Sequence, residues 1–131
     1  MNKTILIIED DTFTQELYKF LFDRKGYKYT ISDDGEQVLH LLQNNEVGLI
    51  ILDINLKNTY LDGKKIDGIG IAEFVRGSEN YSTIPILVVS AYQSNVNGRN
   101  LIKEKLVDDF IVKPIIDFNQ LLEKINRFMT Q

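Results

Sequence analysis

Cysteine is absent from the 131-residue sequence, which excludes a disulfide framework, a zinc site built on thiolates and a catalytic thiol. A long apolar run near the start is also missing, because the apolar residues 5–8 lead directly into Glu9. Such a short run cannot serve as the apolar region of a signal peptide or as a membrane span. We therefore expect a cytoplasmic protein that makes no membrane contact.

An excess of positive charge is missing as well. The net charge is −4 at pH 7, which argues against direct binding of nucleic acid. Hydrophobic residues make up 44% and charged residues 26% of the chain, a globular rather than a disordered composition. Linkers, repeats and low-complexity segments are lacking, so we expect one domain over residues 1–131.

The most informative stretch that is present covers residues 48–55, Gly-Leu-Ile-Ile-Leu-Asp-Ile-Asn. Consecutive apolar residues without alternation predict a strand buried on both faces, as in a parallel sheet covered by helices. Asp53 ends this run, and ligands of open α/β sheets bind beyond the carboxyl ends of the strands. Asp53 is therefore the first candidate functional residue.

Strand and helix patterns alternate along the whole chain. Apolar or β-branched runs predict strands at residues 5–8, 27–31, 48–52, 84–89 and 109–112. Apolar residues at helical spacing predict helices at residues 13–25, 36–44, 69–76, 96–106 and 118–129. The fourth helix is weak, because Asn97, Gly98 and Asn100 interrupt it. The alternation predicts an α/β fold, a doubly wound parallel sheet of five strands with five helices.

Polar side chains stand where four of these strands end. Glu9 and Asp10 follow the first strand, Asp53 the third, Ser90 the fourth and Lys113 the fifth. Because the strands are expected to be parallel, these side chains should meet at one edge of the sheet. Clustered carboxylates need a cation, and oxygen ligands suit Mg²⁺. An aspartate beside Mg²⁺ and a lysine is arranged to attack a phosphoryl group and form an aspartyl phosphate.

The chain resembles the receiver domains of response regulators in two-component signalling. The resemblance is carried by ILIIEDD, LIILDINL, IDGIGIAEFVR, IPILVVSAY and DDFIVKP, which cover nearly the whole chain in the family's order. It implies a flavodoxin-like fold with strand order 2-1-3-4-5. It also implies a stand-alone receiver that takes its phosphoryl group from a histidine kinase or a histidine phosphotransfer protein. Phosphorylation would then relay the phosphate or alter binding of a downstream protein at the face formed by the fourth helix, fifth strand and fifth helix.

The resemblance implies a role for each acidic residue. Asp53 would be the phosphoacceptor and also a metal ligand. Glu9 and Asp10 would form the acidic pair that holds Mg²⁺, and Asn55 would offer its backbone carbonyl to the metal. Asp11 lies outside this pair and is expected to cap the first helix, a role that Thr12 could also take.

Further roles follow on the other side of the expected site. Ser90 stands where the family has a hydroxyl residue that turns toward the phosphoryl group. Phe110 stands at the aromatic switch position, where tyrosine is commoner. Lys113 would bind a phosphoryl oxygen, and the Lys113–Pro114 peptide bond is expected to be cis.

The segment at about residues 56–66 departs from the family, because it is longer than the usual loop and lacks its proline. It carries Lys57, Lys64 and Lys65 and has no apolar period, so we expect a long loop. It could be a solvated surface insertion, which chains tolerate well, or a lid or partner contact beside Asp53. Tyr92, which follows Ser90, is expected near the mouth of the site.

Two other classes of function stay open. A pseudo-receiver would bind partners without being phosphorylated, but the full set of site residues argues against it. A phosphatase with an aspartyl nucleophile usually needs a second acid two residues further on, where this chain has Asn55.

Overall fold

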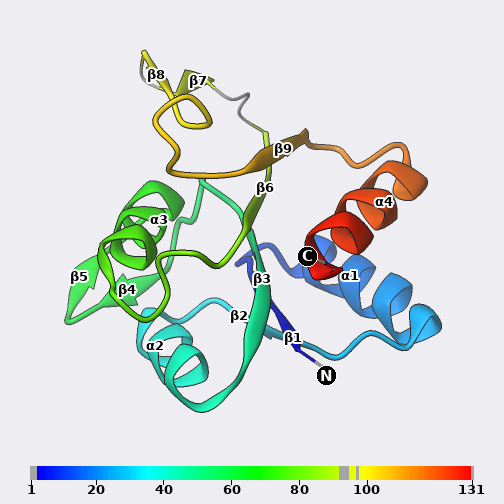
Figure 1. The fold of residues 1–131 in the computed structure, drawn as a ribbon, viewed down its shortest axis with the longest axis horizontal. Coiled ribbons are helices and arrows are strands. Elements are labelled where there is room, and N and C mark those ends of the chain that lie inside the picture. Colours follow the sequence, from blue (N-terminus) through cyan, green and yellow to red (C-terminus); the bar gives the residue numbers. More distant parts are fainter. Residues whose placement is uncertain (1–2, 92–94, 97, 131) are drawn as a thin grey trace.

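A five-stranded parallel sheet forms the centre of the molecule (Figure 1). The computed structural model describes residues 3–91, 95–96 and 98–130. The strands of this sheet are β1 (Thr4–Ile8), β2 (Tyr29–Ser32), β3 (Val47–Leu52), β6 (Ile86–Ser90) and β9 (Asp109–Val112). They lie in the order β2-β1-β3-β6-β9, and every neighbouring pair is parallel. This arrangement confirms the strand order 2-1-3-4-5, counted over these strands along the chain.

Helices cover both faces of the sheet, with α1 (Thr12–Lys25) and α4 (Phe118–Met129) on one face and α2 (Gly35–Asn44) and α3 (Gly68–Gly77) on the other (Figure 1). Successive residues of a strand point to opposite faces, so a strand between two helical layers needs apolar residues throughout. In β1, Ile5 and Ile7 pack with α1 and α4, while Leu6 and Ile8 pack with α2 and α3. No helix in the described ranges has the length and apolarity that a membrane crossing demands.

Each of the four helices begins behind an aspartate. The carboxylate of the residue before the helix accepts a hydrogen bond from a backbone N–H of the first turn, which satisfies a donor that the helix leaves free. The capping residues are Asp11, Asp34, Asp67 and Asp117. Of the two candidates at the first helix, Asp11 is therefore the cap and Thr12 is the first helical residue.

The predicted helix at residues 96–106 is wrong. In its place the described residues show a small antiparallel pair, β7 (Asn95–Val96) and β8 (Arg99–Asn100), followed by turns. Gly98 has a φ of 78°, and asparagine and glycine are weak helix formers. Leu101, Leu106 and Val107 are nevertheless buried, so turns satisfy the apolar pattern that suggested a helix.

The long segment after β3 is more ordered than the expected loop. It contains a two-stranded antiparallel hairpin, β4 (Tyr60–Leu61) and β5 (Lys64–Lys65). Asp62 and Gly63, at the tip, have φ values of 57° and 74°, which fits a two-residue turn with both residues left-handed. An Asp-Gly pair is a strong signal for such a turn, and this signal in the sequence indicates the hairpin. We call residues 57–65 the insertion hairpin.

Candidate functional site

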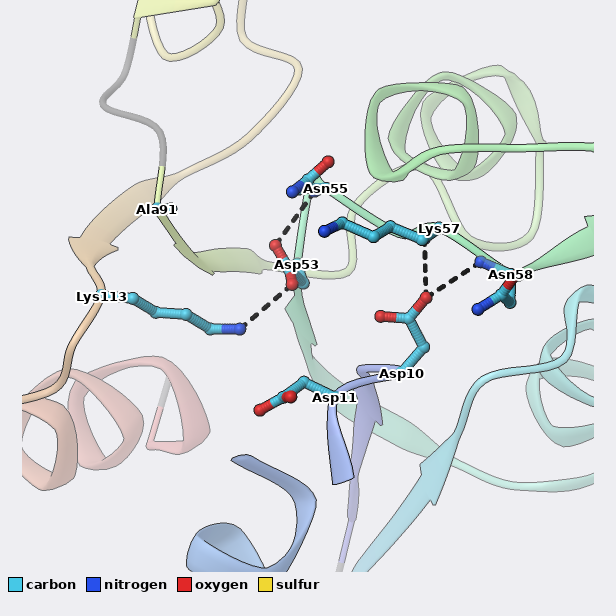
Figure 2. Close-up of a pocket in the computed structure, with 8 residues that line it drawn as sticks. All are labelled: Asp10, Asp11, Asp53, Asn55, Lys57, Asn58, Ala91 and Lys113. Carbon is cyan, nitrogen blue, oxygen red and sulfur yellow. Dashed lines mark hydrogen bonds and ion pairs between the residues drawn. The ribbon is translucent and has the colours of Figure 1, made fainter. Parts of the chain in front are cut away.

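The carboxyl ends of β1, β3 and β9 meet at one edge of the sheet, around a cavity of about 260 Å³ (Figure 2). Glu9 and Asp10 follow β1, Asp53 follows β3 and Lys113 follows β9. The structure therefore brings together side chains from three stretches that stand far apart in the sequence. The residues that line the cavity are Asp10, Asp11, Asp53, Asn55, Lys57, Asn58, Ala91 and Lys113.

Lys113 joins two buried carboxylates. Its Nζ lies 2.8 Å from Oε1 of Glu9 and 3.1 Å from Oδ2 of Asp53. Glu9 is 1% exposed and Asp53 is 6% exposed, so both acids depend on protein partners in place of water. The backbone N–H of Asp11 adds a hydrogen bond to Oε2 of Glu9, at 3.1 Å.

The pKa values of Glu9 and Lys113 are both raised in the site. Burial, together with the charge of Asp53, raises the pKa of Glu9 to about 7, although the hydrogen bond from Lys113 opposes this. Burial alone would lower the pKa of Lys113, but the hydrogen bonds and charges of Glu9 and Asp53 raise it overall. One ammonium group thus forms ion pairs with two buried acids, and Asp10 adds a third carboxylate nearby. A further cation would be stabilised here.

The donor set fits a hard divalent cation. Glu9, Asp10 and Asp53 each offer a carboxylate oxygen, and these oxygens lie within 4.8 Å of one another. Oxygen ligands at this density suit Mg²⁺, which also keeps several of its waters. The backbone N–H of Asn55 donates to Oδ1 of Asp53 at 3.0 Å and so restrains the Asp53 side chain. The expected role of the Asn55 carbonyl as a metal ligand stays a prediction.

Asp10 has partners that the sequence analysis missed. Its Oδ2 accepts hydrogen bonds from the backbone N–H groups of Lys57, at 2.6 Å, and Asn58, at 3.1 Å (Figure 2). Both donors belong to the first residues of the insertion hairpin. Backbone N–H groups leave no side-chain signal in a sequence, although the start of the insertion close behind Asp53 does place it at this edge of the sheet.

The two expected switch residues lie on β6 and β9. Ser90 is fully buried, and among the described residues its hydroxyl has no hydrogen-bond partner. A buried hydroxyl without a partner is uncommon and calls for an explanation. Phe110 is half-buried and packs against the core between the sheet and helices α2 and α3. The Lys113–Pro114 peptide bond is cis, as expected, whereas Tyr92 lies outside the described residues.

Fold and site together define a class of protein: a parallel α/β domain whose strand ends gather three acids and a lysine. Residues 5–126 match the family described as the response regulator receiver domain. The chain belongs to this family. Receiver domains are regulators of two-component signalling that act with histidine kinases and downstream partners.

Relatives align with most of this chain, but their own lengths differ. The CAI-1 autoinducer sensor kinase/phosphatase CqsS of Vibrio cholerae is 27% identical over 124 residues, which are 94% of this chain and 17% of that protein. The polar-differentiation response regulator DivK of Brucella ovis is 24% identical over 115 residues, which are 88% of this chain and 87% of DivK. The chain thus corresponds to a small part of CqsS and to most of DivK.

Solved structures share the fold. The receiver domain of the sensor histidine kinase PA1611 from Pseudomonas aeruginosa PAO1 has a TM-score of 0.79 and 21% identity, with 100% of both chains covered. That structure holds a magnesium ion in its active-site cleft. At this identity the likeness shows the fold alone.

Proposed function

We propose that this chain receives a phosphoryl group on Asp53 from a phosphohistidine of a histidine kinase or a histidine phosphotransfer protein. The observation that carries the proposal is the Asp53 carboxylate, which is 6% exposed at the open end of β3. Its Oδ2 lies 3.1 Å from the Lys113 ammonium, beside the acids Glu9 and Asp10. Phosphoryl transfer depends mainly on positioning and on neutralising charge, and this set of side chains supplies both.

In the proposed reaction a carboxylate oxygen of Asp53 attacks the phosphorus atom, and the bond between phosphorus and the histidine nitrogen breaks. Glu9, Asp10 and Asp53 would hold Mg²⁺, with the Asn55 carbonyl as a further ligand, and the ion would neutralise phosphoryl charge. The magnesium ion in the PA1611 receiver domain supports this part of the proposal. Lys113 would bind a phosphoryl oxygen and leave part of its present pairing with Glu9 and Asp53.

The signal would then pass through Ser90 and Phe110. A phosphoryl oxygen would give the buried Ser90 hydroxyl the hydrogen bond that it lacks among the described residues. The partner face expected from the sequence needs revision, because its first helix is absent from the described residues. We place this face on β9, α4 and the turns after β8, which expose the apolar residues Val112, Phe118 and Ile102.

The direct test is incubation with acetyl phosphate and Mg²⁺, followed by mass spectrometry of the intact protein and of its peptides. We expect one phosphoryl group on Asp53 and none in Asp53→Asn. Asp11→Asn is the matched control: this carboxylate also lines the cavity, and asparagine caps a helix about as well as aspartate. Phosphorylation of another carboxylate in the wild-type protein would overturn the assignment.

Failure to form any adduct would favour the alternative, a phosphorylation-independent pseudo-receiver. Rapid turnover of phosphate esters would favour the phosphatase instead. We regard the protein as a regulator rather than an enzyme in the usual sense, with slow loss of its own phosphoryl group. Its location in the cytoplasm stays a prediction.

A further inference from the structure

Asp10 has different hydrogen-bond partners from the other two acids of the site, Glu9 and Asp53. Glu9 and Asp53 both contact Lys113, and each also accepts a backbone N–H from its own neighbourhood. Within the described part of the chain, the Asp10 carboxylate accepts hydrogen bonds only from the N–H groups of Lys57 and Asn58. Asp10 therefore owes its orientation to the insertion hairpin.

Both of these hydrogen bonds use the same oxygen of Asp10, Oδ2. Each carboxylate oxygen has its own lone pairs, so Oδ1 is left for another partner. Figure 2 shows this second oxygen turned away from the two amides, toward the side of the cavity where Asp11 and Asp53 lie. The amides thus leave this oxygen on the side of the cavity where Asp53 lies, and one carboxylate oxygen from each of Glu9, Asp10 and Asp53 lies within 4.8 Å of the others.

The insertion hairpin is itself fixed to the start of α2. The Glu36 carboxylate accepts the backbone N–H of Asp62, at the hairpin tip, at 2.6 Å. Gly35 lies so close to the hairpin that a Cβ added there would overlap the Tyr60 carbonyl oxygen and reach the Leu61 Cβ at 3.0 Å. A continuous set of contacts therefore runs from α2 through the hairpin to Asp10.

We propose that the insertion hairpin is a positioning element for the divalent cation: docked on α2, it holds the Lys57 and Asn58 amides that orient Asp10. Without these amides, repulsion from Glu9 and Asp53 would turn the half-buried Asp10 toward solvent, because no cation pairs with it in the described residues. A ligand that is already oriented loses less conformational freedom when the ion binds. The inference uses only the cation-binding part of the proposed function.

A proline substitution at the first donor tests the amide directly. Lys57→Pro removes the N–H that forms the 2.6 Å hydrogen bond, whereas the matched variant Lys57→Ala removes the side chain and keeps this N–H. The readout is Mn²⁺ affinity, measured from the free Mn²⁺ signal in electron paramagnetic resonance, with no phosphodonor present. We expect Lys57→Pro to bind Mn²⁺ about tenfold more weakly than Lys57→Ala, since loss of a hydrogen bond to a metal ligand typically costs about 10–100-fold.

A second pair of variants changes a residue outside the cavity. It keeps the proposal testable if Lys57→Pro fails to fold. Gly35→Ala should displace the hairpin from α2 and weaken Mn²⁺ binding severalfold, even though alanine favours a helix over glycine. Gly77→Ala is its control, because Gly77 also lies in a helix and a Cβ there meets nothing within 4 Å. Thermal melts of all four variants confirm that each is folded at the temperature of the titration.

The outcomes separate this inference from the proposed function. If the wild-type protein binds no Mn²⁺, the assignment of the metal site is overturned, and the positioning role is overturned with it. If it binds Mn²⁺ but Lys57→Pro equals Lys57→Ala and Gly35→Ala equals Gly77→Ala, the metal site stands and the positioning role is refuted. Weaker binding by Lys57→Pro and by Gly35→Ala, each against its own control, supports the role.

Discussion

The connections that follow β3 and β6 differ in the contacts that anchor their outer segments, the insertion hairpin and residues 98–107. In the connection after β3, Ile54 and Leu56 are buried in the core, but the insertion hairpin that follows them is held by polar contacts, in which the carboxylates of Asp10 and Glu36 accept its backbone N–H groups. The described end of the connection after β6 is held by apolar contacts, in which Leu101, Leu106 and Val107 enter the core between the sheet and helices α2 and α3.

This difference suggests that the two segments affect different properties: cation affinity in one case and the free energy of folding in the other. Polar contacts that end on a candidate metal ligand can change the affinity of the site while adding little to the free energy of folding. Apolar side chains that enter the core stabilise the fold in proportion to the area they bury. Substitutions in the insertion hairpin should therefore alter cation binding, and substitutions of the buried residues after β8 should alter stability.

The largest effect is expected at Leu101, which is 0% exposed. Leu101→Ala should lower the free energy of unfolding by about 2–5 kcal/mol, because it leaves a cavity in the core. Urea denaturation measures this loss, and Ile102→Ala is the control, since Ile102 is 39% exposed. Mn²⁺ affinity of the folded Leu101→Ala protein should equal that of the wild type. A tenfold change in affinity would contradict the claim that the buried residues after β8 affect stability and not cation binding.

Lys113 follows β9, a strand at the edge of the sheet, and should affect the response to phosphorylation. Its contact with a phosphoryl oxygen would be a hydrogen bond between charged groups, worth about 1.5–3 kcal/mol, which is enough to shift a two-state equilibrium. We expect phosphorylated Lys113→Ala to stay mostly in the unphosphorylated conformation. Hydrogen exchange with and without acetyl phosphate measures the shift. An exchange difference equal to that of the wild type would refute this role.

Shortening the insertion to the length usual in the family tests the polar connection as a whole. We expect the melting temperature to stay within a few degrees, because Lys57, Lys64 and Lys65 are exposed and the hairpin adds little to the core. Mn²⁺ affinity should fall about tenfold, which corresponds to about 1.4 kcal/mol.

The shortened protein should also differ from the wild type in the lifetime of phospho-Asp53 or in the kinase that phosphorylates it. A dephosphorylation time course and a phosphotransfer panel measure both properties. If stability, affinity, lifetime and kinase choice all equal those of the wild type, the insertion hairpin is a passive surface feature.

The same contrast explains how far the sequence could predict the structure. The run that leads to Asp53 is apolar throughout, as a strand between two helical layers requires. Parallel strands end at one edge, so the meeting of Glu9, Asp53 and Lys113 could be predicted from their positions alone. The regular core and the main side chains of the site are therefore accessible from the sequence.

The two connections were harder to predict, each for a physical reason. The spacing of Leu101 and Leu106 resembles a helical face, but Gly98 turns the chain with a positive φ before a helix can form. The hairpin was missed because its strands are two residues long and show no period, although its Asp62-Gly63 tip carries a turn signal. The amides that hold Asp10 depend on backbone geometry, which side-chain patterns do not reveal.

The smallest expected effect concerns Asp109, a polar anchor between β9 and α4 on the proposed partner face. Burial raises the pKa of its carboxyl, but the hydrogen bonds from Lys124, at 2.6 Å, and from other donors including Arg127 lower it overall, below its ordinary value of 3.8. A carboxyl with a lowered pKa stabilises the fold above its unfolded pKa and loses this contribution as the pH falls through the folded pKa. Asp109→Asn should therefore cost about 1 kcal/mol at neutral pH, with most of the loss from the contact with Lys124, whose side chain is 18% exposed, and little from the largely exposed Arg127.

As the pH falls from 3.8 through the lower pKa of folded Asp109, the difference between the wild type and Asp109→Asn should shrink toward zero, since Asp109 becomes protonated first in the unfolded and then in the folded wild type. Urea denaturation of both proteins across this range measures the difference. A loss at neutral pH as large as that of Leu101→Ala would contradict the comparison, because a polar anchor would then stabilise the fold as strongly as a core leucine. A difference that persisted at low pH would show that the carboxyl acts through its shape or packing, not through its charge.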